Sequence, residues 1–242
     1  HHRDFANLST IAHNNAMPAT YNALESHCPL IVYIDIKSPY AFVAIKPTLA
    51  LEAELGIQFD WRPLTLDIPS YLGSARKKEG RVIESDRTPQ QWSGVKYAYR
   101  DARRYAERQG YMLKGTEKIW DSSLINIGIL WVVEHDRARL PNFFEAAYPP
   151  FWQRALDVED VDVVKATIEA SGVRAEGFES YASGIGRQRH DDLQNQLHPA
   201  GIYGVPTYVF DKHILFGREH LPYVRWYLSG QRGAAPDIAY EI

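Results

Sequence analysis

The chain has 242 residues, of which 45% are hydrophobic and 24% charged, enough for one large globular domain or a smaller one with an insertion. A net charge of −3 gives no basic excess for nucleic-acid binding, and no apolar run is long enough to span a bilayer. The single cysteine, Cys28, excludes an intramolecular disulfide and a multi-cysteine metal site, and we interpret it as a buried or incidental thiol. Residues 4–21 lack the apolar core of a signal peptide, so the expected compartment is the cytoplasm.

A strand followed by a helix is predicted near the start of the chain. Residues 30–35 form an apolar, β-branched run of strand length. Ser38 and Pro39 are typical of a helix N-cap and of the first helical position, and Gly56 is typical of a helix end. Residues 57–61 alternate as a second strand. This order predicts a βαβ unit with parallel strands.

The middle of the chain favours helices. Residues 63–89 are rich in Pro, Gly and charge, and we interpret them as a loop. Helical patterns follow over residues 90–109, 121–135, 142–156, 161–171, 176–182 and 186–197. The strand pattern resumes over residues 203–210 and 213–216 as a hairpin, before a last helix over residues 220–228. The predicted order is therefore βαβ, a helical block, and ββα.

Five short motifs occur along this predicted framework. They are Asp35-x-x-Ser38-Pro39-Tyr40, Trp61-Arg62-Pro63, Tyr97-x-x-x-Asp101-x-x-Arg104-x-Ala106, Gly204-Val205-Pro206-Thr207 and Phe216-Gly217-Arg218-Glu219-His220-Leu221. In this order they resemble the DsbA-like superfamily of thioredoxin folds. Within it they are similar to the 2-hydroxychromene-2-carboxylate isomerases and the kappa-class glutathione transferases.

The resemblance implies an α/β, thioredoxin-like fold with a large all-helical insertion, and it covers about residues 31–228. The implied organisation is an N-terminal extension (1–29), a thioredoxin-like domain (30–64 and 200–230), a helical insertion domain (65–199) and a C-terminal tail (231–242). Proteins of these families commonly dimerise, so a homodimer is expected.

The implied function is glutathione-dependent isomerisation of a small aromatic-derived carboxylate. A kappa-type glutathione transferase and a non-catalytic thioredoxin-fold binding protein remain open alternatives. The expected partner is a small-molecule substrate, with neither nucleic acid nor membrane involved. A dithiol oxidoreductase is not expected, because Ser38 and Ala41 stand where a thioredoxin-like fold carries its Cys-x-x-Cys.

The resemblance places the cofactor, glutathione or another low-molecular-weight thiol, beside Ser38, whose hydroxyl would hold the sulfur. A helix N-terminus favours a thiolate; the alternative is that Ser38 is a plain N-cap. Val205, before a cis Pro206, would pair its backbone with the cysteinyl part. Glu219 and His220 would lie near the γ-glutamyl end. They depart from the Asp-Arg of the family, and the alternative is that they cap the last helix.

Five residues are candidates for binding the substrate: Lys37, Tyr40, Arg62, Tyr97 and Asn126. Lys37 replaces an apolar residue of the family, and its charge would favour a thiolate or a substrate carboxylate; the alternative is a solvent-exposed lysine. Arg62 would hold a carboxylate bidentately, or else pair with a structural acid such as Asp35 or Asp101.

The remaining candidates belong to the motifs and the helical block. Tyr40 directly follows the Ser-Pro pair. Tyr97 would wall an aromatic pocket, although an aromatic residue on a helix is more often part of the core. Asn126 lies in an apolar helix and needs a hydrogen-bond partner if it is buried. Asp35, at a strand end, fits a structural role better than a catalytic one.

Overall fold

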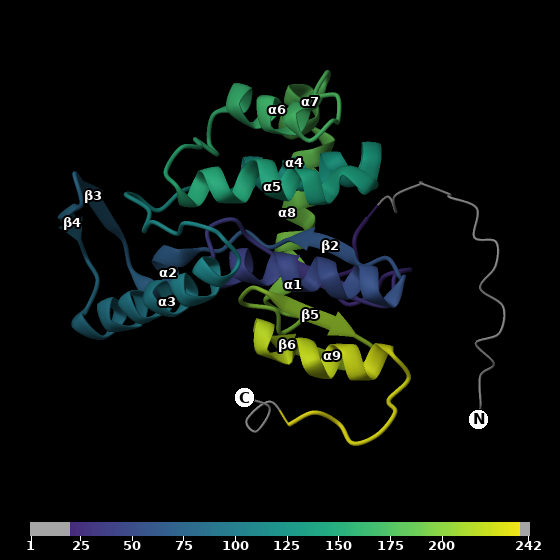
Figure 1. The fold of residues 1–242 in the computed structure, drawn as a ribbon. Coiled ribbons are helices and arrows are strands. Elements are labelled where there is room, and N and C mark those ends of the chain that lie inside the picture. Colours follow the sequence, from purple (N-terminus) through teal and green to yellow (C-terminus); the bar gives the residue numbers. More distant parts are fainter. Residues whose placement is uncertain (1–19, 238–242) are drawn as a thin grey trace.

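In a computed structural model, residues 20–237 form a mixed α/β fold around a four-stranded sheet (Figure 1). The strands are β1 (Ile31–Ile34), β2 (Asp60–Pro63), β5 (Thr207–Phe210) and β6 (His213–Phe216). Most of the predicted N-terminal extension, up to residue 19, and the end of the predicted tail, from residue 238, lie outside the described residues.

The sheet has the order β2-β1-β5-β6. Strand β1 pairs in parallel with β2 and antiparallel with β5, which forms a hairpin with β6. This arrangement confirms the predicted βαβ and ββα units. Strand β2 begins three residues later than predicted, because its pairing with β1 starts where Ile31 lies opposite Asp60.

Helix α1 (Pro39–Leu55) begins and ends where the sequence predicts. Ser38 is the N-cap, and its side chain accepts a hydrogen bond from the Ala41 N–H. Gly56 ends the helix with a positive φ of 64°, a conformation that glycine adopts without steric cost. The N-terminus of α1 therefore lies directly after the C-terminal end of β1, with Ser38 at the junction.

Residues between the two halves of the sheet are mainly helical. The helices are α2 (Ile68–Leu72), α3 (Pro89–Arg108), α4 (Ser123–Asp136), α5 (Leu140–Trp152), α6 (Val161–Ala170), α7 (Phe178–Ser183) and α8 (Ile185–Leu197), with a 3₁₀ turn, η1 (Arg137–Arg139), before α5. After the sheet, η2 (Arg218–His220) leads into α9 (Leu221–Leu228). Among these described helices none is both long and apolar enough to cross a membrane.

A two-stranded hairpin interrupts the helical insertion where the sequence indicates a loop. Strands β3 (Ala75–Lys78) and β4 (Arg81–Ser85) pair antiparallel at the margin of the molecule (Figure 1). The loop prediction is wrong here because all of β4 is exposed, so no alternation of buried and exposed residues marks the strand. The Lys77 N–H fixes the hairpin to the body by donating to the Glu117 carbonyl at 2.7 Å.

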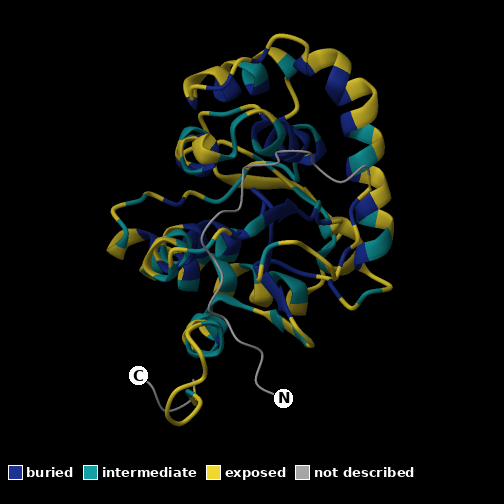
Figure 2. Cartoon of the chain, turned by 90° about the vertical axis from the view of Figure 1, so that its right-hand side faces the viewer, coloured by how far each residue is buried: buried dark blue, intermediate teal, exposed yellow. Residues whose placement is uncertain are grey.

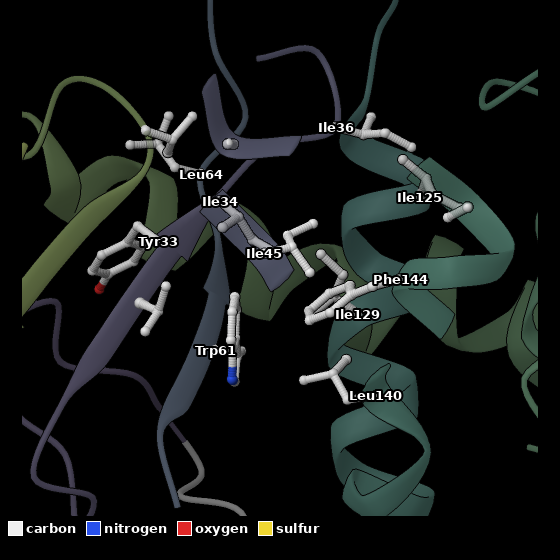
Figure 3. Close-up of a cluster of buried hydrophobic side chains, with 14 of the residues drawn as sticks. Tyr33, Ile34, Ile36, Ile45, Trp61, Leu64, Ile125, Ile129, Leu140 and Phe144 are labelled. Atoms are coloured by element: carbon white, nitrogen blue, oxygen red, sulfur yellow. The ribbon is translucent and has the colours of Figure 1, made fainter. Parts of the chain in front are cut away.

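The sheet and the insertion share one hydrophobic core, and Figure 2 shows its buried residues in the interior of the fold. In the cluster of Figure 3, side chains of the sheet and α1 face those of α4 and α5: Ile34, Ile45 and Trp61 meet Ile125, Ile129 and Phe144. The Trp61 and Phe144 ring centroids are 5.0 Å apart. This packing joins helices α4 and α5 to the strand that leads into the Ser38 position.

Candidate active site

Ser38 lies between the N-terminus of α1 and the loop that precedes β5. The residue is 6% exposed, and its Oγ accepts the Ala41 N–H at 3.1 Å. The same hydroxyl donates to the Val205 carbonyl at 3.2 Å, and the Val205–Pro206 peptide bond is cis. Two residues 167 positions apart in sequence thus meet at one point, as the family resemblance implies.

Two backbone donors accompany this hydroxyl. Within the described residues, neither the Tyr40 N–H nor the Val205 N–H donates a hydrogen bond. The Tyr40 N–H belongs to the first turn of α1, where the positive end of the helix dipole adds to its effect. The Ser38 hydroxyl has only one hydrogen, which is committed to Val205. It must rotate away from that carbonyl to donate to a ligand, whereas the two N–H groups are available directly.

Helix α3 brings a polar and aromatic face to the start of α1. The Tyr40 hydroxyl donates to Asp101 Oδ2 at 3.0 Å, and Asp101 Oδ1 accepts from Arg104 at 2.5 Å. Burial, and then the hydrogen bond to Asp101, raise the pKa of Tyr40, so its hydroxyl keeps its proton near neutral pH. Tyr97 lies one turn before Asp101 and is 56% exposed, so it is a surface residue and not part of the core.

Lys37 points into the protein and not into solvent. It is 8% exposed, and its Nζ donates to the Leu66 carbonyl at 2.5 Å. The same Nζ lies 3.9 Å from Asp35 Oδ2, and the Asp35 side chain is fully buried. The alternative of a solvent-exposed lysine is therefore wrong: Lys37 is a buried cation paired with a buried acid.

Arg62 is not available to a substrate. Its Nε and Nη2 bind Asp60 Oδ2, Nη2 also donates to the Glu25 carbonyl, and Nη1 donates to the Asn22 carbonyl and the Tyr33 hydroxyl. These contacts use all five N–H groups of the guanidinium. The predicted carboxylate-binding role is thus corrected to a structural one. The acid that Arg62 pairs with is Asp60, two residues away, and neither Asp35 nor Asp101.

Asn126 is completely buried on α4 and contacts residues that follow β1 and β2. Its Nδ2 donates to Thr65 Oγ1 at 2.8 Å and lies 3.3 Å from Asp35 Oδ1 and 3.4 Å from Ser122 Oγ. The hydrogen-bond partners that the sequence calls for are thus present for the amide nitrogen. Its Oδ1 has no partner among the described residues. Asn126 therefore links α4 to the C-terminal end of β1 through its contact with Asp35.

Glu219 and His220 are the last two residues of η2, directly before α9. The Glu219 carboxylate folds back over Gly217, at the position where a Cβ on that glycine would project. His220 is the N-cap residue of α9 and makes no side-chain capping bond, so the capping alternative is not supported. The sequence motifs did not single out Arg218. Its Cζ lies 4.0 Å from the Tyr105 ring centroid, so this residue connects η2 to α3. The sequence feature that could have indicated Arg218 is its positive charge within the Phe216–Leu221 motif.

The described residues support neither a nucleophilic cysteine nor a metal site. Cys28 precedes β1, at the opposite end of that strand from Ser38, and burial and then Asp60 raise the pKa of its thiol. An activated cysteine nucleophile would require a lowered thiol pKa. Across residues 20–237, no group of three or more His, Cys, Asp or Glu side chains could hold a metal ion.

A cavity of about 340 Å³ lies between the segment after α3 and the end of α5. None of the predicted site residues lines it. Its walls are formed by Thr116, Glu117, Trp120, Phe151, Arg154, Ala155, Leu156 and Asp157.

His190 provides a pH-dependent contribution to stability. It is buried on α8 between Thr65 Oγ1 and Asp191 Oδ1, both at 2.7 Å. Burial lowers the pKa of His190; Arg187 acts in the same direction, and Asp191 and Asp121 oppose it. The unfolded state therefore takes up a proton at higher pH than the folded state. The free energy of unfolding should fall as the pH decreases through the histidine range and continue to fall down to the folded-state pKa.

We expect His190→Gln to reduce the loss of stability between about pH 7 and about pH 5, because the glutamine does not titrate. Chemical denaturation at both pH values measures the difference. The control is His198→Gln, which replaces an exposed histidine at the end of the same helix. An equal pH dependence in the His190 variant and the wild type would contradict this assignment.

With the geometry described, comparison with known proteins gives the family. The model of the DSBA-like thioredoxin domain matches residues 29–229. The chain belongs to this family. The match confirms the superfamily and the fold class that the sequence motifs indicate. A curated relative, 2-hydroxychromene-2-carboxylate isomerase of Sphingobium xenophagum, is 25% identical over 199 residues, which are 81% of this chain and 95% of that protein.

Solved structures of DSBA-like proteins share the fold. A selenomethionine 2-hydroxychromene-2-carboxylate isomerase has a TM-score of 0.63 and 16% identity, covering 83% of this chain and 94% of its own. The cytosolic disulfide reductase DsbM from Pseudomonas aeruginosa, in a structure with GSH, has a TM-score of 0.55 and 18% identity over 84% of this chain and 98% of its own. Isomerases and disulfide enzymes thus share the architecture, and the identity of the residues at the turn must distinguish them.

Proposed function

We propose that this DSBA-like protein is a glutathione-dependent isomerase of a small aromatic-derived carboxylate, similar to 2-hydroxychromene-2-carboxylate isomerase. The observation that carries the proposal is the meeting of the Ser38 hydroxyl with the Val205 backbone at the N-terminus of α1. The curated relative, which aligns over 95% of its own length, is consistent with the proposal. When bound, glutathione supplies a thiolate that adds reversibly to a conjugated double bond, which allows rotation before the thiolate leaves.

The residues at the site fit such a thiol. The Tyr40 and Val205 N–H groups are donors without partners among the described residues, and they belong to the first turn of α1 and to the residue whose carbonyl accepts from Ser38. The Tyr40 N–H is the backbone donor we assign to the sulfur anion, and such a donor stabilises the charged form and lowers the thiol pKa, as does the helix N-terminus. The Val205 N–H and C=O would pair with the cysteinyl backbone in the manner of an added strand. Rotation of the Ser38 hydroxyl from Val205 to the sulfur would accompany binding.

The substrate would lie against the start of α1 and the face of α3. Tyr97 offers an exposed aromatic ring, and the protonated Tyr40 hydroxyl is held by Asp101. We propose these two residues for substrate contact, and Glu219 and His220 for the γ-glutamyl end. We assign no substrate contact to Lys37 or Asn126: Lys37 contributes a buried positive charge at the turn, and Asn126 holds the turn through Asp35. The cytoplasmic location and the homodimer remain predictions that accompany this function.

An assay with glutathione and 2-hydroxychromene-2-carboxylate tests the proposal directly. An isomerase should convert the substrate without net consumption of glutathione and lose activity when the thiol is omitted. Stoichiometric formation of a glutathione conjugate, detected by mass spectrometry, would instead identify a kappa-type transferase. Thiol binding without turnover of either kind would favour a binding protein, and the absence of thiol binding would contradict the proposal.

A second experiment concerns disulfide chemistry. A dithiol enzyme must carry two sulfurs at its reactive turn, and this chain has Ser38 and Ala41 there. We expect no reduction of insulin disulfides in the presence of dithiothreitol above the rate without protein. The variant with both Ser38→Cys and Ala41→Cys serves as a positive control for the assay on this fold. Insulin reduction by the wild type would contradict our alignment of the turn.

A further inference from the structure

A continuous chain of hydrogen bonds runs from α8 through the segment after β2 and α4 to the end of β1. Asp191 Oδ1 and His190 Nδ1 are 2.7 Å apart, as are His190 Nε2 and Thr65 Oγ1. Asn126 Nδ2 lies 2.8 Å from the same Thr65 oxygen and 3.3 Å from Asp35 Oδ1. Four segments distant in sequence therefore meet through polar side chains, in a region that is otherwise a hydrophobic core.

The donors and acceptors fix the direction of this chain. The Asn126 amide nitrogen can only donate, so Thr65 Oγ1 accepts from it. The Asp191 carboxylate accepts from the Nδ1–H of His190, which leaves Nε2 of the neutral ring as an acceptor for the Thr65 hydrogen. The four contacts named above all form in this one arrangement, and among their residues Thr65 alone both accepts from α4 and donates to α8. Valine has the same shape but would break both links.

At its other end the chain reaches the Ser38 turn, residues 35–38. Asp35 accepts the Lys37 N–H with Oδ1 at 3.4 Å and the Ser38 N–H with its carbonyl at 3.1 Å. Its Oδ2 accepts the Leu66 N–H at 2.8 Å, while Lys37 Nζ donates back to the Leu66 carbonyl. Asp35 and Lys37 thus attach the turn to the residue that follows Thr65.

We propose that Asn126, Thr65 and His190 are positioning residues, through which helices α4 and α8 hold the Ser38 turn. The insertion then has a role at the thiol site besides covering it. If the Thr65 hydroxyl is lost, Asn126 and His190 each lose a partner, and on the side of α8 residue 65 keeps only the bond from its backbone N–H to Gln194 Oε1 at 2.8 Å. The Leu66 carbonyl then holds Lys37 less firmly, and the turn with its N–H donors becomes less ordered.

The first test measures Lys37, and it does not depend on the proposed function. Lys37 Nζ is buried and hydrogen-bonded, so its reductive methylation should be slow relative to that of the exposed Lys96. We expect Thr65→Val to accelerate methylation of Lys37 about tenfold, because the loss of both Thr65 side-chain hydrogen bonds reaches Lys37 only in part, through Leu66. Thr65→Ser keeps the hydroxyl and should leave the rate within about twofold of wild type. Unchanged protection of Lys37 in Thr65→Val would overturn the proposal.

The second test rests on the proposed function and measures the pKa of bound glutathione. Thr65→Val should raise this pKa toward that of free glutathione, and Thr65→Ser should restore the wild-type value. If the wild type does not bind glutathione, the proposed function fails, and the Lys37 measurement still decides the positioning role. Should Thr65→Val not fold, His190→Phe removes the acceptor for the Thr65 hydrogen and should also speed methylation of Lys37. Equal Lys37 protection in His190→Phe and wild type would count against the proposal.

Discussion

Replacing Ser38 with alanine should raise the pKa of a bound glutathione thiol by about one to two units, because a hydrogen bond to a charged group contributes about 1.5–3 kcal/mol. The Ser38 hydroxyl is the one side-chain donor at the junction of α1 and Val205 that we assign to the sulfur. Ultraviolet absorbance of the thiolate, recorded over a pH titration of the complex, measures this shift. The rate of isomerisation near neutral pH should fall in parallel, by roughly ten- to a hundredfold.

The control for this prediction uses the N-cap role of Ser38. Alanine at an N-cap costs about 1 kcal/mol of stability, whereas glycine costs only a few tenths. Ser38→Gly should therefore raise the thiol pKa as much as Ser38→Ala does, while the protein unfolds at nearly the wild-type denaturant concentration. If the glycine variant keeps the wild-type thiol pKa, Ser38 acts only as a helix cap.

Asp35→Asn is expected to destabilise the fold by about 3 kcal/mol, the typical cost of removing one partner from a buried ion pair. The asparagine is nearly isosteric, so packing is preserved. The Lys37 ammonium, however, remains buried with its counter-charge removed. Asparagine also places an N–H₂ group beside backbone donors that now point at a carboxylate oxygen. Denaturant-induced unfolding of the variant and the wild type measures the difference.

The matched control is the double variant Asp35→Asn with Lys37→Met. Removal of both charges should recover part of the stability, because the methionine needs no counter-charge. The two single changes should thus be strongly non-additive. Simple additivity of the two free-energy changes would show that Asp35 and Lys37 do not stabilise each other, and would contradict the description of them as a pair.

Local signals made much of the fold predictable. The Ser38-Pro39 pair marks the start of α1, and Gly56 marks its end, because capping depends on residues adjacent in sequence. The apolar run of β1 and the hairpin of β5 and β6 follow from patterns within a few residues. The β3–β4 hairpin was not predictable in this way, since β3 is only half-buried at alternate positions, β4 is exposed throughout, and neither strand carries a buried face.

The candidate site was also predictable only in part. The family motifs place Ser38 and Val205 at one thiol site, but they predict neither the direct contact between the two residues nor the orientation of the hydroxyl. Lys37 lies in the turn after β1, and the direction of its side chain depends on where the fold places Asp35 and the Leu66 carbonyl. The Asp60 partner of Arg62 likewise depends on the fold, and residue type alone does not fix it. Thr65 and His190 have no local signal at all. Their roles arise only when segments 125 positions apart are brought together.

The pKa of the glutathione thiol bound to the wild-type protein tests the central claim most directly. The site offers a helix N-terminus, two N–H donors without partners among residues 20–237, and a serine hydroxyl that cannot form a disulfide. We predict saturable binding and a bound-thiol pKa at least about one unit below the ordinary thiol value of about 8.5. A bound thiol with an unshifted pKa, or no binding at millimolar glutathione, would contradict the account of Ser38 as the centre of a thiol-activating site.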